Sequence, residues 1–194
     1  MIKRVCVNCG SSPGSDPAFV CAARDLGDCL AGRDVAVVYG GADVGLMGAV
    51  ANAALARGGQ VIGVIPEIFA DKVGHKKLSE QHVVSSMHER KQMMFDLSDA
   101  FVVLPGGYGT IEEMFEVLTW AQLGMHAKPI GLLNVAGYFD SLLTFLDASV
   151  ENRFVTPQHR DMVLVESSAD SLLDLLWQYE PIVLDKWIDR EENS

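Results

Sequence analysis

Short apolar segments rich in valine and isoleucine alternate with amphipathic segments along almost the whole chain. The apolar segments are nearly continuous in hydrophobicity, as in strands buried on both faces of a parallel sheet. Strands are expected at Lys3–Asn8, Asp34–Tyr39, Gln60–Ile65, Gln81–Ser85, Ala100–Leu104, Pro129–Leu133 and Met162–Val165. Helices are expected at Pro17–Ala31, Gly45–Arg57, Met87–Leu97, Ile111–Leu123, Tyr138–Val150 and Ser168–Tyr179. This alternation predicts an α/β fold with a doubly wound, mainly parallel sheet flanked by helices.

The chain of 194 residues is expected to form a single α/β domain. It shows no internal repeat, low-complexity tract or linker. We expect residues 1–185 to form the core and residues 186–194 to form a C-terminal tail. The polar, lysine-bearing stretch 66–80 is expected to be a loop.

The balance of charge argues against a nucleic-acid partner. The formal net charge is −11, and a field of this sign repels phosphate backbones. This net charge does not prevent the binding of a small anion at a local site. The first residues lack the apolar core of a signal peptide, and no apolar run reaches the 18 or so residues of a membrane helix. We therefore expect a cytoplasmic protein that does not associate with membranes.

All four cysteines lie within the first 30 residues, and Cys6 and Cys9 have the spacing of some redox and zinc sites. Cys6 falls in an expected strand, where residues three apart point to opposite faces. No second pair of metal ligands follows at a suitable spacing. We interpret the cysteines as structural or incidental, and the five histidines likewise show no metal spacing.

Three expected strands run directly into glycine. Their ends read CGSS at residues 9–12, YGGADVG at 39–45 and LPGGYGT at 104–110. Because ligands bind beyond the carboxyl ends of parallel strands, the three loops are expected on one edge of the sheet. A glycine loop that leads into a helix offers free N–H groups to an anion such as phosphate. The alternative is a set of tight turns, with Thr110 as a helix N-cap.

The glycine pattern narrows the nucleotide class. The chain contains no G-x-x-x-x-G-K-[ST] motif, and Glu112 stands where a dinucleotide fingerprint would place its third glycine. A mononucleotide or sugar phosphate is therefore expected in preference to NAD or ATP.

One carboxylate and one arginine stand out near these loops. Glu113 follows the 104–110 loop, where it could meet a sugar ring, or could complete a capping box with Thr110. Arg90 lies in the first turn of the helix that begins after Ser86, where a cation opposes the helix dipole. This placement favours a ligand role over an ordinary solvated arginine. Met87 could line an apolar slot for a flat ring.

Taken together, the motifs M-x-x-R-K at residues 87–91 and P-G-G-x-G-T-x-x-E at 105–113 resemble the signature of the LONELY GUY family. These are cytokinin riboside 5′-monophosphate phosphoribohydrolases, often labelled "possible lysine decarboxylase". The segments CGSS at 9–12 and YGGAxxGLMG at 39–48 are also similar to this family. Ala42 departs from it, because many members carry a third glycine there.

The resemblance implies a Rossmann-like homodimer that hydrolyses the N-glycosidic bond of AMP or an N6-substituted, cytokinin-type nucleoside 5′-monophosphate. It places the catalytic roles on Arg90 and Glu113. The residues expected to contact substrate or phosphate are Ser11, Ser12, Met87, Lys91, Gly106, Gly107, Gly109 and Thr110. No metal or other cofactor is expected.

Two other classes of function stay open on the sequence. A non-catalytic nucleotide-binding or sensor module would share the glycine loops without needing Glu113. In a purely structural partner protein, the glycines would only make turns. A PLP-dependent lysine decarboxylase is disfavoured, because Lys128 lacks the signature of a Schiff-base lysine.

Overall fold

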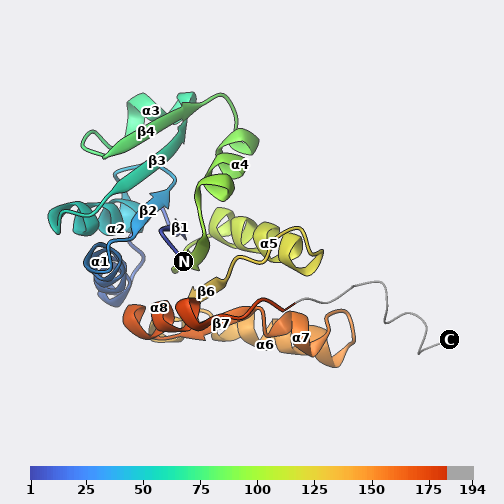
Figure 1. Cartoon of the computed structure of the whole chain (residues 1–194). Helices are drawn as coiled ribbons and strands as arrows, with labels where there is room; N and C mark the ends of the chain where they lie inside the picture. Colours follow the sequence, from blue (N-terminus) through green and yellow to red (C-terminus); the bar gives the residue numbers. More distant parts are fainter. Residues whose placement is uncertain (183–194) are drawn as a thin grey trace.

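A seven-stranded, fully parallel sheet forms the centre of the computed structural model, which describes residues 1–182 (Figure 1). The strand order is β4-β3-β2-β1-β5-β6-β7. The strands are β1 (Arg4–Asn8), β2 (Ala36–Tyr39), β3 (Val61–Pro66), β4 (Glu80–Val84), β5 (Ala100–Val103), β6 (Ile130–Leu133) and β7 (Val163–Glu166). All seven expected strands are confirmed, with ends shifted by at most two residues. The tail expected at 186–194 lies outside the described residues.

The helices confirm six of the expected segments and add two. They are α1 (Pro17–Gly32), α2 (Gly45–Ala56), α3 (Glu67–Val73), α4 (Met87–Leu97), α5 (Tyr108–Gln122), α6 (Asp140–Glu151), α7 (Pro157–Arg160) and α8 (Ala169–Gln178), with a 3-10 turn η1 (Val135–Gly137). The expectation of a loop over 66–80 was wrong where α3 forms. None of the residues of α3 is buried, so its sequence carries no apolar periodicity. The short α7 begins with Thr156 as N-cap and Pro157, a start signal that was overlooked.

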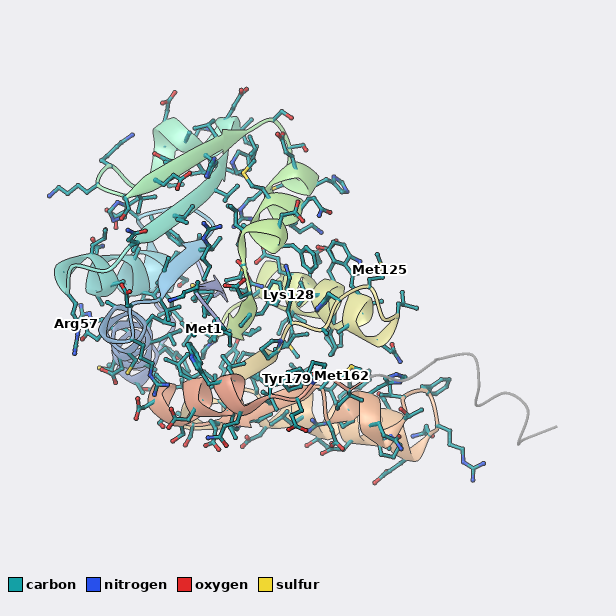
Figure 2. All side chains as sticks on the ribbon, viewed as in Figure 1. Met1, Arg57, Met125, Lys128, Met162 and Tyr179 are labelled. Carbon is teal, nitrogen blue, oxygen red and sulfur yellow. The ribbon has the colours of Figure 1, made fainter. Side chains whose placement is uncertain are left out.

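The helices cover both faces of the sheet, and their side chains fill the space beside it (Figure 2). Val5 and Val7 of β1 pack in one apolar cluster with residues of α1, α2 and α8. Cys6, between them, packs on the other face in a cluster with residues of α4 and α5. This alternation is the period of two that a strand imposes on its side chains. The result is a three-layer α/β sandwich. Within residues 1–182, no helix is long and apolar enough to span a membrane.

The order of the strands reverses between β1 and β5. From β1 the chain adds β2, β3 and β4 on one side, and then returns to add β5, β6 and β7 on the other. The helices that follow β1 and β5 therefore leave towards opposite faces (Figure 1). Open α/β sheets hold ligands at this kind of switch point, outside the carboxyl ends of the strands. The fold thus places the loops after β2, β1 and β5 side by side.

Candidate active site

The three glycine loops meet at the switch point, as the sequence predicted. The N–H of Gly10 donates to Pro105 O at 3.0 Å, and the N–H of Leu46 donates to Gly10 O at 3.0 Å. Gly45 has a φ of +55°, and a Cβ there would lie only 2.4 Å from the carbonyl carbon of Ser11. The loops after β1, β2 and β5 are therefore packed backbone against backbone, which a side chain at Gly45 would prevent.

A pocket of about 320 Å³ opens between the loops after β1 and β5. Its lining residues come from these loops, from α1 and α2, and from the segment after β6. They are Gly10, Ser11, Ser12, Pro13, Gly14, Phe19, Leu46, Pro105, Gly106, Gly107 and Tyr138. Ser11 and Ser12 are exposed and line this pocket together with Gly106 and Gly107. The structure thus brings together four of the residues expected to contact phosphate.

The start of α5 differs from the expectation in one respect. Gly107 is the N-cap and the helix begins at Tyr108, so the expectation that Thr110 caps the helix was wrong. Thr110 is buried within the first turn, and a Cβ on Gly106 would lie 2.1 Å from its Oγ1. Packing of the threonine side chain against a glycine therefore outweighs its preference for the cap position. The Thr110–Glu113 capping box is absent from this helix start.

This earlier start leaves the first N–H groups of α5 at the loop. The opening N–H groups of a helix have no partner inside the helix, and the helix dipole adds a partial positive charge there. Open space surrounds Gly107 and Gly109 where a Cβ would lie. An anion can therefore approach the backbone at this point.

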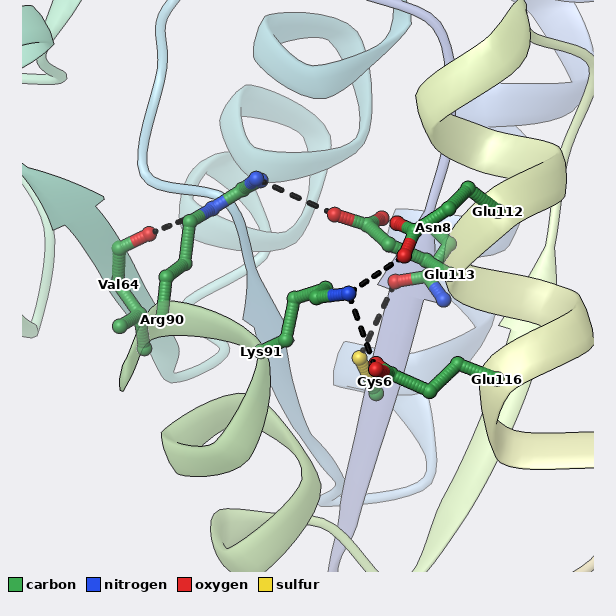
Figure 3. A network of polar contacts seen from close by, with 8 residues as sticks. All are labelled: Cys6, Asn8, Val64, Arg90, Lys91, Glu112, Glu113 and Glu116. Atoms are coloured by element: carbon green, nitrogen blue, oxygen red, sulfur yellow. Dashed lines mark hydrogen bonds and ion pairs between the residues drawn. The ribbon is translucent and has the colours of Figure 1, made fainter. Parts of the chain in front are cut away.

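A buried ion pair lies beside the loops (Figure 3). Nη1 of Arg90 on α4 lies 3.1 Å from Oε1 of Glu113 on α5, and each side chain is 13% exposed. The Nε of Arg90 donates to Val64 O on β3 at 3.2 Å. A Cβ on Gly40, after β2, would lie 1.9 Å from Nη2 of Arg90. The guanidinium thus crosses the ends of β3 and β2 in space that Gly40 leaves free, and Arg90 is not an ordinary solvated arginine.

The start of α4 sets the position of Arg90. Oγ of Ser86 accepts the N–H of Glu89 at 3.2 Å, as an N-cap does. Oε2 of Glu89 accepts the N–H and the hydroxyl of Ser85, at 2.8 and 2.7 Å. The first turn is therefore fixed by its own side chains, which aims Arg90 at the sheet ends.

Burial governs the protonation of the site. It raises the pKa of Glu113, and the charge of Arg90 opposes this shift only in part. A carboxyl group with a raised pKa is suited to exchange protons with a substrate or water. Burial, and next the nearby Glu113, also raise the pKa values of Cys6 and Cys9. These thiols stay protonated at neutral pH, which disfavours a nucleophilic or redox role for them.

Lys91 and Met87 lie on the same helix as Arg90 but in different settings. Nζ of Lys91 pairs with Glu112, and with Oε1 of Glu116 at 3.0 Å (Figure 3). Lys91 therefore links α4 to α5, with both of its partners on α5. Met87, the first residue of α4, is 41% exposed, so its thioether is accessible to a ligand.

Two residues near the site were not among those proposed from the sequence. Gly40 was noted only as part of a motif, and its role in making room for Arg90 depends on packing that the sequence does not display. Tyr138 donates its hydroxyl to Gly106 O at 2.6 Å. It follows β6, so the rule that strand ends carry ligand residues could have drawn attention to it. Among residues 1–182, no group of three or more His, Cys, Asp or Glu side chains is arranged to hold a metal ion.

Comparison with known proteins shows what this chain is similar to. A family model described as "Possible lysine decarboxylase" matches residues 47–176. A probable cytokinin riboside 5′-monophosphate phosphoribohydrolase of Oryza sativa subsp. japonica is 52% identical over 181 residues, which cover 93% of this chain and 80% of the relative. A cytokinin riboside 5′-monophosphate phosphoribohydrolase of Arabidopsis thaliana is 48% identical over 180 residues, which cover 92% of this chain and 83% of the relative.

Solved structures of more distant proteins share the fold of this chain. The molybdenum cofactor binding protein of Rippkaea orientalis superposes with a TM-score of 0.71 at 21% identity, covering 92% of this chain and 97% of that one. The Moco carrier protein of Chlamydomonas reinhardtii gives 0.69 at 21% identity, with the same coverage. The extent of the sequence matches shows that this chain belongs to the LONELY GUY family, the group of phosphoribohydrolases whose family model is described as "Possible lysine decarboxylase".

Proposed function

We propose that this protein is a nucleoside 5′-monophosphate phosphoribohydrolase. It cleaves the N-glycosidic bond of AMP or of an N6-substituted, cytokinin-type nucleotide, and releases the free base and ribose 5-phosphate. The observation that carries the proposal is the buried Arg90–Glu113 pair beside three converging glycine loops. The names of the relatives at 52% and 48% identity support the same reaction.

The phosphate of the substrate rests on backbone N–H groups at the start of α5. Gly107 and Gly109 leave this approach open, and Ser11 and Ser12 line the adjacent pocket. Since backbone groups and a helix dipole supply the attraction, the net charge of −11 does not prevent binding. Lys91, already paired with two carboxylates, contributes to the phosphate only at a distance.

Glu113 and Arg90 act on the other end of the ribose. Cleavage of the bond between C1′ and the base nitrogen passes through an oxocarbenium-like state, as in glycoside hydrolysis. The carboxylate of Glu113 stabilises that positive charge and accepts a proton from the attacking water. The water oxygen bonds to C1′, the electron pair of the broken bond leaves with the base, and the base gains the proton. Arg90 orients Glu113 and the nucleotide, and Met87 offers an apolar surface to the base.

A PLP-dependent decarboxylase is not supported by the lysines near the sheet. Lys128 precedes the amino end of β6, whereas the site lies at the carboxyl ends of the strands. Its Nζ donates to Phe95 O at 2.7 Å and lies over the ring of Phe95. Lys91 is held in ion pairs. Neither amine is therefore placed to form a Schiff base beside the glycine loops.

We also propose a cytoplasmic homodimer that binds neither nucleic acid nor membranes. Trp120 packs edge-on against Phe95 within the chain. Leu123 and Met125 are 45% and 66% exposed and are available to a second copy. Gel filtration with light scattering would test the dimer, and a monomeric mass at micromolar concentration would contradict it.

Chromatography of a nucleotide panel tests the activity. The panel contains AMP, N6-isopentenyladenosine monophosphate and their nucleosides, with wild type, Glu113→Gln and Arg90→Ala. With wild type, fast release of free base and ribose 5-phosphate is expected from the 5′-monophosphates, and only slow release of free base is expected from the nucleosides. Undiminished base release by both variants would contradict the roles of these residues. A thermal shift with AMP but no turnover of any nucleotide would support a sensor instead.

A further inference from the structure

Tyr138 reaches from the segment after β6 to the glycine loop after β5, and the reaction described above gives it no role. Its Oη donates to Gly106 O at 2.6 Å. The side chain is 44% exposed and lines the same pocket as Ser11 and Gly107. Tyr138 is therefore a pocket residue and not part of the apolar core.

The hydrogen bond acts on the peptide that leads into α5. The described residues contain no cis peptide, and in a trans peptide the carbonyl and the N–H point in opposite directions. When Tyr138 holds the carbonyl of Gly106, it also fixes the direction of the N–H of Gly107. That N–H belongs to the N-cap residue of α5, which has no side chain to restrain it. Two adjacent glycines would otherwise let this peptide rotate.

The turn that presents Tyr138 is built at a conformational cost. Ala136 has a φ of +50° and Gly137 a φ of +70°, so two successive residues are left-handed, and this is unfavourable for alanine. The side chain of Asn134 accepts the N–H of Phe139 at 2.8 Å and donates to Asp140 at 2.7 Å. Strained backbone that is restrained in this way is frequent where a side chain must be placed accurately.

Two aromatic rings hold the phenol of Tyr138 in place. Phe139, which is buried, packs edge-on against it with ring centres 4.9 Å apart. Phe19 of α1 does the same from the other side of the pocket, at 5.4 Å. The hydroxyl is consequently restrained by the turn, by two rings and by its own hydrogen bond.

We propose that Tyr138 is a positioning residue for phosphate: it orders the Gly106–Gly107 peptide so that the N–H groups at the start of α5 are arranged before the substrate binds. This inference rests on the proposed function for the location of the phosphate. Neither Arg90 nor Glu113 lines the pocket that Tyr138 lines, so we expect Tyr138 to contribute to binding and not to bond cleavage. When the phosphate-binding N–H groups are ordered before the substrate binds, the entropic cost of binding is lower and the chemical step is unchanged.

The test is Tyr138→Phe, which keeps the ring contacts and removes only the hydroxyl. Loss of one hydrogen bond predicts that the KM for AMP rises about threefold to tenfold while kcat changes less than about twofold. The Kd for inorganic phosphate, measured by calorimetry, should rise by the same factor. The slow hydrolysis of adenosine, which lacks the phosphate, should keep its kcat/KM. Tyr179→Phe, at the residue that directly follows α8, is the matched control and should change none of these values.

Two results would overturn the inference. An unchanged affinity for inorganic phosphate, or no phosphate binding by wild type, would remove the positioning role. Equal losses of kcat with AMP and adenosine, together with a lower melting temperature, would show a merely structural role. If wild type released no base from any nucleotide while the phosphate affinity still fell in Tyr138→Phe, the proposed reaction would fail and the positioning role would stand.

Discussion

Two ion-pair clusters join α4 to α5 from adjacent positions, Arg90 and Lys91, and they differ in the number and the burial of their carboxylates. Arg90 meets one carboxylate, both side chains are 13% exposed, and the pKa of that carboxyl is raised. Lys91 meets Glu112 and Glu116, whose side chains are 57% and 25% exposed, and the pKa of Lys91 is raised by these partners against its own desolvation.

On the proposed function, the difference distinguishes a contact that links two helices from a pair that acts on the substrate. In the Lys91 cluster, one ammonium group pairs with two partly solvated carboxylates. Such pairs link the two helices but contribute little to the free energy of unfolding. Burial of the Glu113 carboxylate is only partly offset by the charge of Arg90, so its pKa is raised and the carboxylate is a stronger base than that of an ordinary glutamate. Adjacent residues on one helix thus serve different purposes because their neighbours differ.

The largest effect is expected from Glu113→Gln. The amide can neither take a proton from water nor stabilise a developing positive charge, so we expect kcat for AMP to fall about 10³-fold or more. The melting temperature is measured alongside, because the amide leaves the charge of Arg90 without its counter-charge. Glu112→Gln is the matched control on the other cluster and should retain activity within about threefold. Activity of Glu113→Gln within tenfold of wild type would contradict the distinction.

The next effect is steric and tests the space around the guanidinium. In Gly40→Ala the new Cβ would lie 1.9 Å from Nη2 of Arg90, so the guanidinium must move away from Glu113. We expect kcat/KM to fall about 10²-fold, since a displacement of this size at the site is costly. Gly131→Ala, which meets only the side chain of Leu172 at 3.0 Å, is the control. Comparable losses in the two variants would mean that the effect is general destabilisation.

The pH dependence should reveal the raised pKa of Glu113. The active form is the carboxylate, so kcat/KM should fall as the pH is lowered through a value above that of an ordinary glutamate. In Arg90→Met the opposing charge is lost, and this acidic limb should move to still higher pH. Rate profiles of wild type and Arg90→Met measure the shift, and a limb that stays in place would argue against coupling between the two residues.

Stability should vary with pH in the opposite sense. Between the ordinary pKa of glutamate and the raised value, the folded chain binds more protons than the unfolded chain, so the contribution of Glu113 to stability decreases as the pH rises through this window. Urea unfolding of wild type and Glu113→Gln at several pH values measures this contribution of Glu113 to the free energy of unfolding. A difference between them that is constant with pH would refute the raised pKa.

The smallest effect is expected from Lys91→Met. Its partners are partly solvated, so the free energy of unfolding should fall by about 1 kcal/mol or less. Activity should stay within about threefold, because the methionine keeps the aliphatic packing between the helices. Urea unfolding and the AMP assay check both values. A loss of activity close to that of Glu113→Gln would place Lys91 in the binding machinery after all.

The prediction of the elements succeeded where local pattern and environment agree. The buried strands are continuous apolar runs, and the predicted ends of every strand lie within two residues of the observed ends. Prediction failed at α3, whose residues are all at least partly exposed and so lack periodicity, and at the start of α5, where Thr110 is drawn into the interior. At α3 the exposed residues carry no periodic pattern, and at α5 the packing of Thr110 against Gly106 moves the helix start.

Residue order alone suffices for the parallel α/β class, the three glycine-bearing strand ends and the identity of the arginine and glutamate, because apolar periodicity and short motifs are local properties. Only the tertiary structure decides that Arg90 passes over Gly40 to meet Glu113, that Lys91 is paired elsewhere, and that Tyr138 holds the loop after β5. The hydrogen bond between Arg90 and Glu113 joins residues 23 positions apart, and the one between Tyr138 and Gly106 joins residues 32 positions apart. Their geometry depends on how the helices pack on the sheet. The burial that raises the pKa of Glu113 also results from this packing.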